Sequence, residues 1–475
     1  MLPLLPCVSY RLALIRLTWK KKACVSSHGI SISMEASPLV LYPRKKEAGN
    51  REKLEYPNGH VALRMRDETV RVTRRGVLQG LTASVGLLNM PAIVIRASAE
   101  AQPPPLRPGE ILPDPDFSLL SPTKPFIVGI RPHRVGGVCL KLEDEPIPSR
   151  FGPKFLIHNY GHGGAGITLS FGCASVVADH VQALMRDMRR SRMRPSVAVI
   201  GSGVIGLTVA AELRRRWRRM PIAVYAKELD VRKTTSFMAG GQFGPSGIGQ
   251  EYETDEEKNV LADYLRRSRR RIIELQNSSR AHAYGIAIRR DYTLDHRNPA
   301  YDYHTPLDVI PPYRFGTLPF KNLNTTGREY RTWLINPTIL LPRLVAELKR
   351  SGVPFRVKHF ESKIDCAELR ENIIVNCTGY GAKAIMSDDN VIARRGHLVV
   401  LRKTLPKQFY FFSGGCGNGR IMYVFCRQND IVVGGTWQRG NDSETIGEPD
   451  SATFERILSN ARAMFDGRLV DCVTA

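Results

Sequence analysis

Three glycines with the spacing Gly201-x-Gly203-x-x-Gly206 are the residues whose pattern predicts chemistry most directly. They follow the short apolar run SVAVI, which is typical of a strand, and lead into a run with helical periodicity. In such a turn the first glycine permits the bend, the second lets the backbone approach a pyrophosphate, and the third lets the helix pack on the strand. The helix N-terminus adds N–H groups and the positive end of its dipole. We therefore expect a dinucleotide to bind here.

Residues after the next predicted strand, 222–226, are candidates for the rest of this site. Glu228 stands at the end of that strand, where an acid can hold a ribose hydroxyl. Thr234 and Thr235 offer hydroxyls, and the run Ala239-Gly240-Gly241 is small enough for a backbone to lie against a flat ring. The fingerprint alone leaves both NAD and FAD open as the dinucleotide.

A second glycine-rich stretch, IHNYGHGGAGITLSFGCASVVADHV (157–181), stands before the fingerprint and runs into a helical apolar pattern. We expect His158 and His162 to hold this loop by hydrogen bonds rather than to act as acids or bases. For His133 two positions stay open, lining a pocket or facing solvent.

Taken together, these segments resemble the D-amino-acid oxidase family of FAD-dependent flavoproteins over most of residues 125–440. The matching motifs are GIRPHR (129–134), HNYGHGGAGITLSFGCA (158–174), AVIGSGVIGLT (198–208), VYAKELDVRKTTSFMAGG (224–241), NCTGYGAKA (376–384), RRGHLVVL (394–401) and MYVFCRQNDIVVGG (422–435). The resemblance implies an α/β fold, in which an FAD-binding Rossmann-like domain is interleaved with a substrate domain built on a mixed, mainly antiparallel sheet.

The order of the motifs departs from the family's order. In the family the GIRPHR and HNYGHGG segments close the chain, whereas here they precede the fingerprint. The C-terminal run FERILSNARAMFDGRLVDCVTA resembles the helix that precedes the GIRPHR strand in the family. We therefore predict a circular permutation, in which the termini lie near each other at the surface, where cuts are tolerated. A scrambled gene with a defective product is the alternative.

The predicted organisation follows the chain. The expected parts are an unstructured or untranslated start (1–64), a signal (65–99), a linker (100–115), the permuted C-terminal module (116–194), an FAD-binding part (195–285), a substrate domain with returning FAD-domain segments (286–370), a second FAD-binding part (371–404) and further substrate domain (405–475).

The resemblance also implies site residues. Arg131 matches the arginine that forks the substrate carboxylate, Tyr423 matches a tyrosine that holds the same group, and the Gly164 carbonyl is expected to take the amine. The residues expected to contact FAD are Gly163, Gly164, Gly166, Ile167, Thr168, Gly201, Gly203, Ile205, Gly206, Glu228, Thr234, Thr235, Ala239, Gly240 and Gly241. The alternative roles are a surface charge beside Arg134 for Arg131, and sheet packing for Tyr423.

Two positions depart from the family pattern. Gly419 stands where the family has a second tyrosine, which indicates a wider or differently gated pocket. Lys227 takes the place of the ribose-binding acid, and Glu228 follows it.

The implied reaction removes a hydride from the α-carbon of a D-amino acid to the flavin. The imino acid hydrolyses to a 2-oxo acid and ammonia, and molecular oxygen takes the electrons as hydrogen peroxide. A neutral bound amine needs no strong base, which agrees with the lack of an obvious catalytic His or Glu. A related oxidase of glycine, sarcosine or D-aspartate, an inactive permuted flavoprotein, an NAD-dependent dehydrogenase and a basic binding protein remain open.

Composition narrows the partners. The formal charge is +24, of which +10 lies in residues 1–99. Much of the remaining +14 lies in two helix-like basic runs, 185–194 and 214–220, with only one aromatic residue between them, which predict a solvated face rather than a nucleic-acid site. The nine cysteines form no CxxC pair or metal-ligand spacing, so no metal site or disulfide framework is predicted. Cys173, Cys377 and Cys426 stand among apolar residues and are expected to be buried. The sequence leaves the oligomeric state open.

An export signal is predicted at residues 65–99. Arg74-Arg75 precedes a moderately apolar stretch, and Ala97-Ser98-Ala99 offers a cleavage site, which resembles a twin-arginine signal. Pro91 and polar residues interrupt the apolar stretch, which disfavours a stable membrane span. We expect export to the periplasm or the exterior; a chance arginine pair in a cytoplasmic protein is the alternative.

Overall fold

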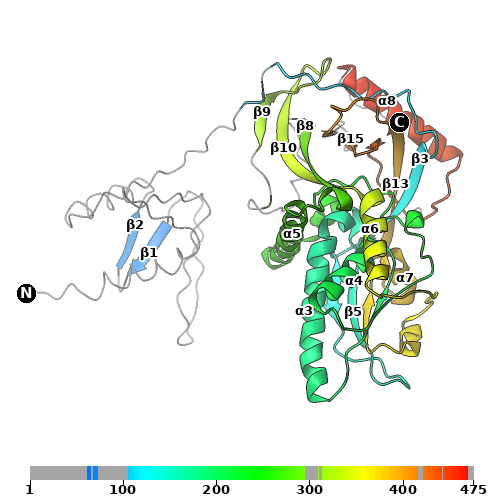
Figure 1. The fold of residues 1–475 in the computed structure, drawn as a ribbon. Helices are drawn as coiled ribbons and strands as arrows, with labels where there is room; N and C mark the ends of the chain where they lie inside the picture. Colours follow the sequence, from blue (N-terminus) through cyan, green and yellow to red (C-terminus); the bar gives the residue numbers. More distant parts are fainter. Residues whose placement is uncertain are drawn as a thin grey trace, which may run out of the picture. The chain divides into compact units, whose positions relative to one another are not determined.

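The computed structural model describes residues 61–65, 68–72, 105–107, 109–294, 309, 313–415, 421–440 and 442–468. The chain divides into two compact units, residues 1–102 and 103–475. In the described part of the first unit, β1 (Val61–Met65) pairs antiparallel with β2 (Glu68–Val72) (Figure 1). Residues 61–64 of this hairpin lie in the part of the chain that was predicted to be unstructured or untranslated. The arginine pair and cleavage site of the predicted signal lie outside the described residues.

The segment predicted as a linker packs on the second unit from residue 105 onward. Leu106 and Leu112 are buried, and their backbone N–H groups donate to the carbonyl oxygens of Phe315 and Pro319. These leucines join an apolar core beneath the larger sheet, so the segment predicted as an extended linker is packed from residue 105 onward.

One sheet of the second unit has six strands among the described residues, in the order β11-β7-β6-β12-β5-β4. All neighbours pair in parallel except β4 and β5. The central strands are buried along their whole length, as expected for a parallel sheet covered on both faces. The strands are β4 (Cys139–Leu142), β5 (Phe155–Tyr160), β6 (Val197–Ile200), β7 (Ile222–Ala226), β11 (Phe355–Val357) and β12 (Ile373–Asn376).

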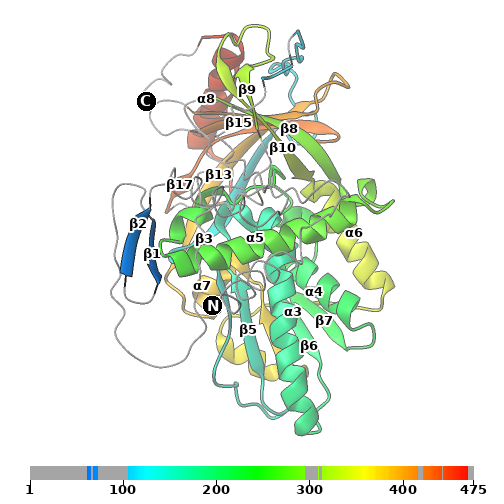
Figure 2. The same cartoon turned by 90° about the vertical axis from the view of Figure 1, so that its left-hand side faces the viewer.

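A layer of helices covers one face of this sheet. Its members are α3 (Gly166–Arg190), α4 (Val204–Arg216), α5 (Asp255–Gln276) and α6 (Pro337–Arg350). α3 packs on both α4 and α5, and α5 crosses it at a steep angle (Figure 2). Among the described helices, the one that includes α3 (163–190) is long and apolar enough to span a membrane. Two thirds of its most apolar stretch is buried, as in the core helix of a folded domain.

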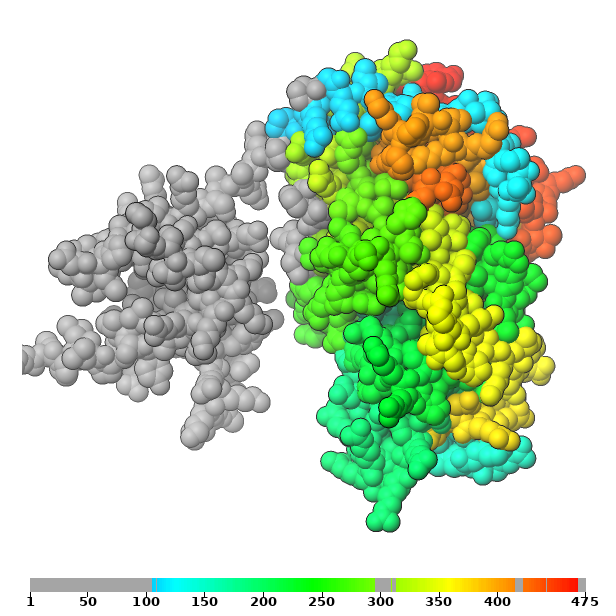
Figure 3. All heavy atoms as spheres, in the orientation of Figure 1, coloured from blue at the N-terminus to red at the C-terminus, as the bar shows by residue number. Residues whose placement is uncertain are grey.

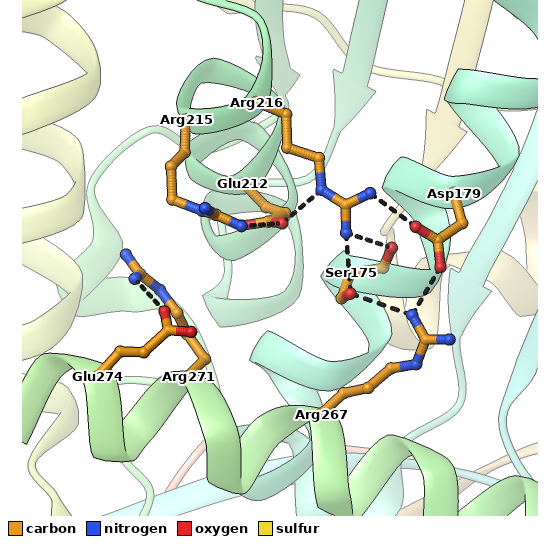
Figure 4. Close-up of polar contacts among 8 residues, drawn as sticks. All are labelled: Ser175, Asp179, Glu212, Arg215, Arg216, Arg267, Arg271 and Glu274. Atoms are coloured by element: carbon orange, nitrogen blue, oxygen red, sulfur yellow. Dashed lines mark hydrogen bonds and ion pairs between the residues drawn. The ribbon is translucent and has the colours of Figure 1, made fainter.

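Ion pairs fix α3 to the two helices beside it (Figure 4). Asp179 on α3 accepts from Arg216 on α4 and from Arg267 on α5, each at 2.6 Å. Both arginines also donate to the hydroxyl of Ser175, one helical turn earlier. Part of the excess positive charge is therefore paired between helices, and it is not a free basic face.

The second sheet has nine strands among the described residues. Their order is β17-β13-β16-β15-β14-β8-β10-β9, and β3 also pairs with β13. Every pair is antiparallel except β14 with β8. α8 (Glu448–Phe465) packs against β13, β15 and β16. The strands are β3 (Phe126–Arg134), β8 (Ile286–Leu294), β9 (Arg314–Thr317), β10 (Thr326–Ile335), β13 (Val391–Arg402), β14 (Tyr410–Gly415), β15 (Ile421–Cys426), β16 (Asp430–Gly434) and β17 (Gln438–Arg439).

The short elements lie mainly in the connections. They are η1 (Gly163–Ala165), η2 (Val231–Lys233), η3 (Ser246–Glu251), η4 (His282–Tyr284), η5 (Lys363–Glu368), η6 (Gly379–Gly381) and α7 (Ala382–Ile385).

The segment ahead of the fingerprint contributes to both sheets. β3 joins the nine-stranded sheet, whereas β4 and β5 join the six-stranded one and α3 covers it. In the space-filling view, cyan residues from the start of the second unit lie beside orange and red ones from its end (Figure 3). The predicted fold class is confirmed. The predicted FAD-binding part 371–404 is shared between the sheets, since it holds both β12 and β13.

Candidate functional site

A cavity of about 910 Å³ lies between the carboxyl ends of the parallel strands and the nine-stranded sheet. Its walls include the residues that follow β5, β6, β7 and β12, the position where open α/β sheets bind ligands. The N-termini of α3 and α4 also open onto it. Two helix dipoles therefore present their positive ends to one cavity.

The fingerprint glycines are required by the local geometry. Gly201 has φ +119°, and a Cβ there would fall on the carbonyl oxygen of Cys377. A Cβ on Gly206 would fall on the carbonyl oxygen of Gly201, so this glycine lets α4 approach its strand. The hydroxyl of Ser236 accepts from the Val204 N–H in the first turn of α4.

Most of the predicted cofactor residues line this cavity. They are Gly163, Gly164, Gly166, Ile167, Gly201, Gly203, Ile205, Glu228, Thr234, Thr235, Ala239, Gly240 and Gly241. Gly206 and Thr168 do not. The Thr168 hydroxyl accepts from the N–H of Gly244 and lies 2.7 Å from the Gly244 carbonyl oxygen, so it joins α3 to a loop. The Thr168 hydroxyl is thus bonded to the protein, and its contact with the flavin stays a prediction.

Glu228 lines the cavity, but its carboxylate already has local partners. It accepts from the Asp230 N–H and from the Lys233 ammonium, both at 2.8 Å. These hydrogen bonds lower the pKa of Glu228.

Buried polar atoms without partners stand where the glycine-rich loop meets the cavity. Asn159 is 0% exposed, lines the cavity and has no partner for either side-chain amide atom. His162 also lines it, and its Nε2 has no partner, so the predicted hydrogen-bonding role does not hold for that atom. Burial lowers the pKa of His162 to about 3, which keeps it neutral. A polar ligand here would satisfy these atoms.

The other two histidines are structural. His158 lies 2.9 Å from Glu143 and 3.3 Å from Asn376, as predicted for a residue that holds the loop. His133 neither lines the cavity nor faces solvent: it is buried, and its Nε2 lies 2.8 Å from the Glu251 carboxylate.

Arg131 and Tyr423 meet at the wall formed by the nine-stranded sheet. The Arg131 guanidinium lies where a Cβ on Gly396 would stand, and the Tyr423 ring lies in the same way over Gly434. Both side chains line the cavity. Burial raises the pKa of Tyr423, and the neighbouring Arg131 guanidinium opposes this shift. The structure therefore brings the two predicted carboxylate-binding residues together. Gly419 lies outside the described residues.

Arg134, the second arginine of the GIRPHR motif, forms an ion pair with Asp388. Its Nε donates to Asp388 at 2.8 Å, and Asp388 also accepts from the Tyr160 hydroxyl at 2.9 Å. Only Arg131 of the GIRPHR motif lines the cavity with its arginine side chain.

Trp437 is a cavity residue that sequence reasoning missed. Its ring centroid lies 5.1 Å from the Arg131 guanidinium carbon, and its edge lies against Gly164 and Gly247. It thus extends from the predicted carboxylate site to the predicted amine site. Trp437 follows two glycines and a threonine and precedes a short polar run, and no motif in this stretch indicates a binding residue.

Gln242 is a second residue that the sequence did not indicate. It lines the cavity, and its amide donates to the buried Asp291 at 2.5 Å. Asp291 is 0% exposed and its Oδ1 has no partner. Burial raises the pKa of Asp291 to about 7, against the opposing hydrogen bond from Gln242.

Comparison with known proteins identifies the family. A family model described as FAD dependent oxidoreductase (DAO) matches residues 196–475. The chain belongs to this family. This FAD-dependent oxidoreductase is similar to D-aspartate oxidase from Homo sapiens, at 24% identity over 273 residues that cover 56% of this chain and 75% of the relative. It is also similar to D-amino-acid oxidase from Streptomyces coelicolor, at 27% identity over 274 residues that cover 56% of this chain and 77% of the relative.

Two solved structures resemble the chain at lower sequence identity. Glycine oxidase from Bacillus cereus ATCC 14579 is 16% identical with a TM-score of 0.42, covering 57% of this chain and 79% of the other. L-alpha-glycerophosphate oxidase from Mycoplasma pneumoniae, in a structure with FAD bound, is 15% identical with a TM-score of 0.39, covering 57% and 78%.

The cavity of this FAD-dependent oxidoreductase fits a dinucleotide on chemical grounds. Glycines and a helix N-terminus line one end, hydroxyls and a carboxylate continue along it, and unpartnered amide and imidazole atoms face it. Cys173, Cys377 and Cys426 are buried, as predicted. Among the described residues, no group of three or more His, Cys, Asp or Glu side chains is placed to hold a metal ion.

Proposed function

We propose that this protein binds FAD without a covalent link and oxidises a D-amino acid to a 2-oxo acid. The observation that carries the proposal is the pairing of Arg131 with Tyr423 in the same cavity as the glycine fingerprint. A guanidinium beside a phenol suits a carboxylate, since an arginine donates two parallel hydrogen bonds to such a group. The family match and the D-amino-acid and D-aspartate oxidase relatives support the same chemistry.

Residues of the chain position the substrate in this proposal. Arg131 binds the carboxylate, Tyr423 donates a further hydrogen bond to it, and the Gly164 carbonyl accepts from the amine. FAD, when bound, supplies the acceptor for the hydride of the α-carbon. FAD would be held by the turn from Gly201 to Ile205, by Thr234 and Thr235, and by residues 239–241. Catalysis then rests on orientation and charge rather than on a side-chain base.

The overall reaction is balanced with oxygen as the electron acceptor. One D-amino acid, one water and one O₂ give one 2-oxo acid, one ammonia and one H₂O₂. The bond broken by hydride transfer is the α-C–H bond, and the amine binds in its neutral form. His162, which lines the cavity, is held neutral by burial and is not a strong base.

The proposal is tested by flavin absorbance. The protein, reconstituted with FAD, is mixed anaerobically with a panel of D- and L-amino acids, with glycine, sarcosine and D-aspartate included. We expect bleaching by D-amino acids and none by their L-forms, and recovery with peroxide release when oxygen is admitted. A protein that binds no FAD, or that L-amino acids alone reduce, contradicts the proposal. Reduction only by glycine, sarcosine or D-aspartate selects the related oxidases.

We also propose that the chain is a circular permutant. The family match begins at residue 196, next to β6, while β3, β5 and α3 come earlier in the chain and complete both sheets. These supporting elements carry the motifs that close the chain in the family that the sequence resembles.

Export by a twin-arginine route is a separate proposal. It rests on Arg74-Arg75 and on the Ala97-Ser98-Ala99 site. Changing both arginines to lysine is expected to leave precursor in the cytoplasm, and fractionation with an immunoblot measures this. Unchanged export of the double variant would show that the arginine pair has no such role.

A further inference from the structure

A β-bulge lies next to Arg131, between β13 and the strands β16 and β17. Leu398 of β13 pairs with Gly434 of β16, and Arg395 pairs with Gln438 of β17. Two residues on β13, 396 and 397, therefore face three residues, 435 to 437, on the opposite strand. Such an extra residue re-aims the side chains and carbonyls around it, and it occurs often beside active sites.

A buried histidine holds the bulge in place. The N–H of His397 donates to the Thr436 hydroxyl oxygen at 2.8 Å, and its Nδ1 lies 2.9 Å from the same oxygen. Since that oxygen already accepts from the backbone, its own proton is free to be donated to Nδ1. Nε2 then carries the ring proton and donates to Asp450 at 2.6 Å. His397 is 0% exposed and Asp450 4%, so this pair is shielded from solvent.

Asp450 is itself fixed at the start of α8. Its second oxygen accepts from Arg395 at 2.7 Å and from the Gly447 N–H at 2.7 Å. The chain of hydrogen bonds runs from the α8 N-terminus through Asp450 and His397 to Thr436.

The far side of the bulge touches the proposed carboxylate anchor. The carbonyl oxygen of Thr436 accepts from Arg131 Nη1 at 3.1 Å, and the next residue, Trp437, places its ring 5.1 Å from the guanidinium carbon. One residue thus has its hydroxyl held by His397 and its carbonyl held against Arg131.

We propose that His397 and Asp450 are positioning residues for Arg131, and that they act through the Thr436 hydroxyl. Their function is to hold the bulge so that the Arg131 guanidinium faces the substrate carboxylate. This inference rests on the proposed function, because it takes Arg131 as the carboxylate anchor. Groups fixed in this way by buried hydrogen bonds keep a binding side chain within the narrow geometry that binding requires.

The test removes the Thr436 hydroxyl and keeps the side-chain shape. The holoenzyme of Thr436→Val is compared with Thr453→Val, which removes another buried hydroxyl, bonded to the Pro449 carbonyl at 3.0 Å on α8 and not connected to Arg131. Propionate is titrated into each and followed by FAD absorbance. The KM and kcat for the best D-amino acid, the FAD Kd and the melting temperature are measured on the same samples.

We expect Thr436→Val to weaken propionate binding and raise KM by about threefold to tenfold, the effect of one hydrogen bond, with kcat at saturation and FAD Kd little changed. Thr453→Val is expected to lower the melting temperature by about as much as Thr436→Val does, and to leave propionate binding unchanged. Thr436→Ser, which restores the hydroxyl, is expected to recover most of the affinity. If Thr436→Val does not fold, Thr436→Ala and Thr453→Ala provide the same comparison without a methyl group against the imidazole.

Equal propionate affinity in the Thr436 and Thr453 variants would overturn the inference. So would a fall in FAD affinity by the same factor as the fall in propionate affinity, since that indicates general distortion. Arg131→Ala separates the two proposals. If that variant binds propionate normally, the proposed function fails. If it loses binding while the two threonine variants are alike, only the positioning role fails.

Discussion

The rings of Phe117 and Phe465 lie with their centroids 5.6 Å apart, although one stands near the start of the second unit and the other ends α8. Next to them, Phe126 at the start of β3 stacks on Phe454 at 4.6 Å, and Arg462 donates to the Phe117 carbonyl at 3.0 Å. The last described helix therefore lies against the segment that leads into β3. The end of α8 therefore lies next to the start of β3, as expected if the two elements were joined in the family order of the motifs.

A chain rearranged into the family order is therefore expected to fold. It would start at residue 195, run to residue 475 and continue directly with residues 103–194, so that the buried Leu106 and Leu112 are kept. We expect the same FAD affinity and a melting temperature within a few degrees, because each packing contact of the second unit is kept and only surface connections change. Absorbance titration and thermal unfolding measure both. A chain opened inside α3, after Ala178, is the control, and it should lose FAD. Failure of both chains to fold would contradict the permutation.

Substitutions at the carboxylate site test the substrate anchor. Arg131→Ala should lower kcat/KM for a D-amino acid by at least about tenfold to a hundredfold, since a charge-assisted bidentate contact is lost. Arg131→Lys should recover little, because an ammonium does not reproduce the planar fork. Tyr423→Phe should cost about tenfold, the effect of one hydroxyl. FAD affinity should stay near that of the unaltered protein in all three.

The control for these variants follows from the ion pairs. Arg190→Ala removes an exposed arginine paired with Asp187 and should leave the kinetics unchanged. Arg134→Ala, in contrast, removes the partner of Asp388 and should reduce stability first. Normal turnover by Arg131→Ala together with loss of turnover by Arg190→Ala would mean that the assigned arginine is wrong.

The sequence predicts the parts of the site that depend on the backbone pattern. Gly201, Gly203 and the strand before them were readable because few other residues permit that turn, and the fold class followed from the motifs. Arg131 and Tyr423 were located through motifs that fix their strands.

Partners that come from distant strands were not readable. The Thr168 hydroxyl turns to Gly244, and no pattern near residue 168 reveals which side of the helix start meets the cavity. The pairs His397–Asp450 and Gln242–Asp291 join segments about 50 positions apart, so they appear only once β13, α8 and β8 are in place. The bulge at Thr436 depends on the register of two strands, which local sequence does not set.

The ion pairs between α3, α4 and α5 are expected to stabilise the fold without affecting chemistry. Asp179→Ala removes the acceptor shared by Arg216 and Arg267, and because its side chain is 45% exposed we discount the charge term to about 1–2 kcal/mol of unfolding free energy. The loss should shrink in high salt. Denaturant unfolding at two salt concentrations measures it, and kcat and KM should stay unchanged. Asp187→Ala, which breaks an exposed pair with Arg190, is the matched control with little expected loss. Equal losses of unfolding free energy in the two variants would show that the ion pairs between the helices stabilise the fold no more than an exposed pair does.

Asp291 is expected to make the stability of the protein fall as pH rises. Its pKa is raised from the ordinary 3.8 to about 7 by burial, so the carboxyl group is neutral in the folded protein at low pH and must ionise in an apolar site at high pH. A raised folded-state pKa gives stability that is complete below about pH 4 and is lost as pH rises through about 7.

Asp291→Asn removes this dependence while its amide oxygen still accepts from Gln242. We expect the stability of the variant relative to the unaltered protein to be higher at pH 8.5 than at pH 5, by an amount on the order of 2–4 kcal/mol of unfolding free energy. Urea unfolding at both pH values, with FAD in equal excess, measures the difference between the two proteins, so that other titrating groups cancel. Asp187→Asn is the control, because that carboxylate is exposed and its effect should be flat with pH. If the difference between Asp291→Asn and the unaltered protein is the same at pH 5 and pH 8.5, the buried carboxyl group does not change its protonation in this range. The raised pKa would then be wrong.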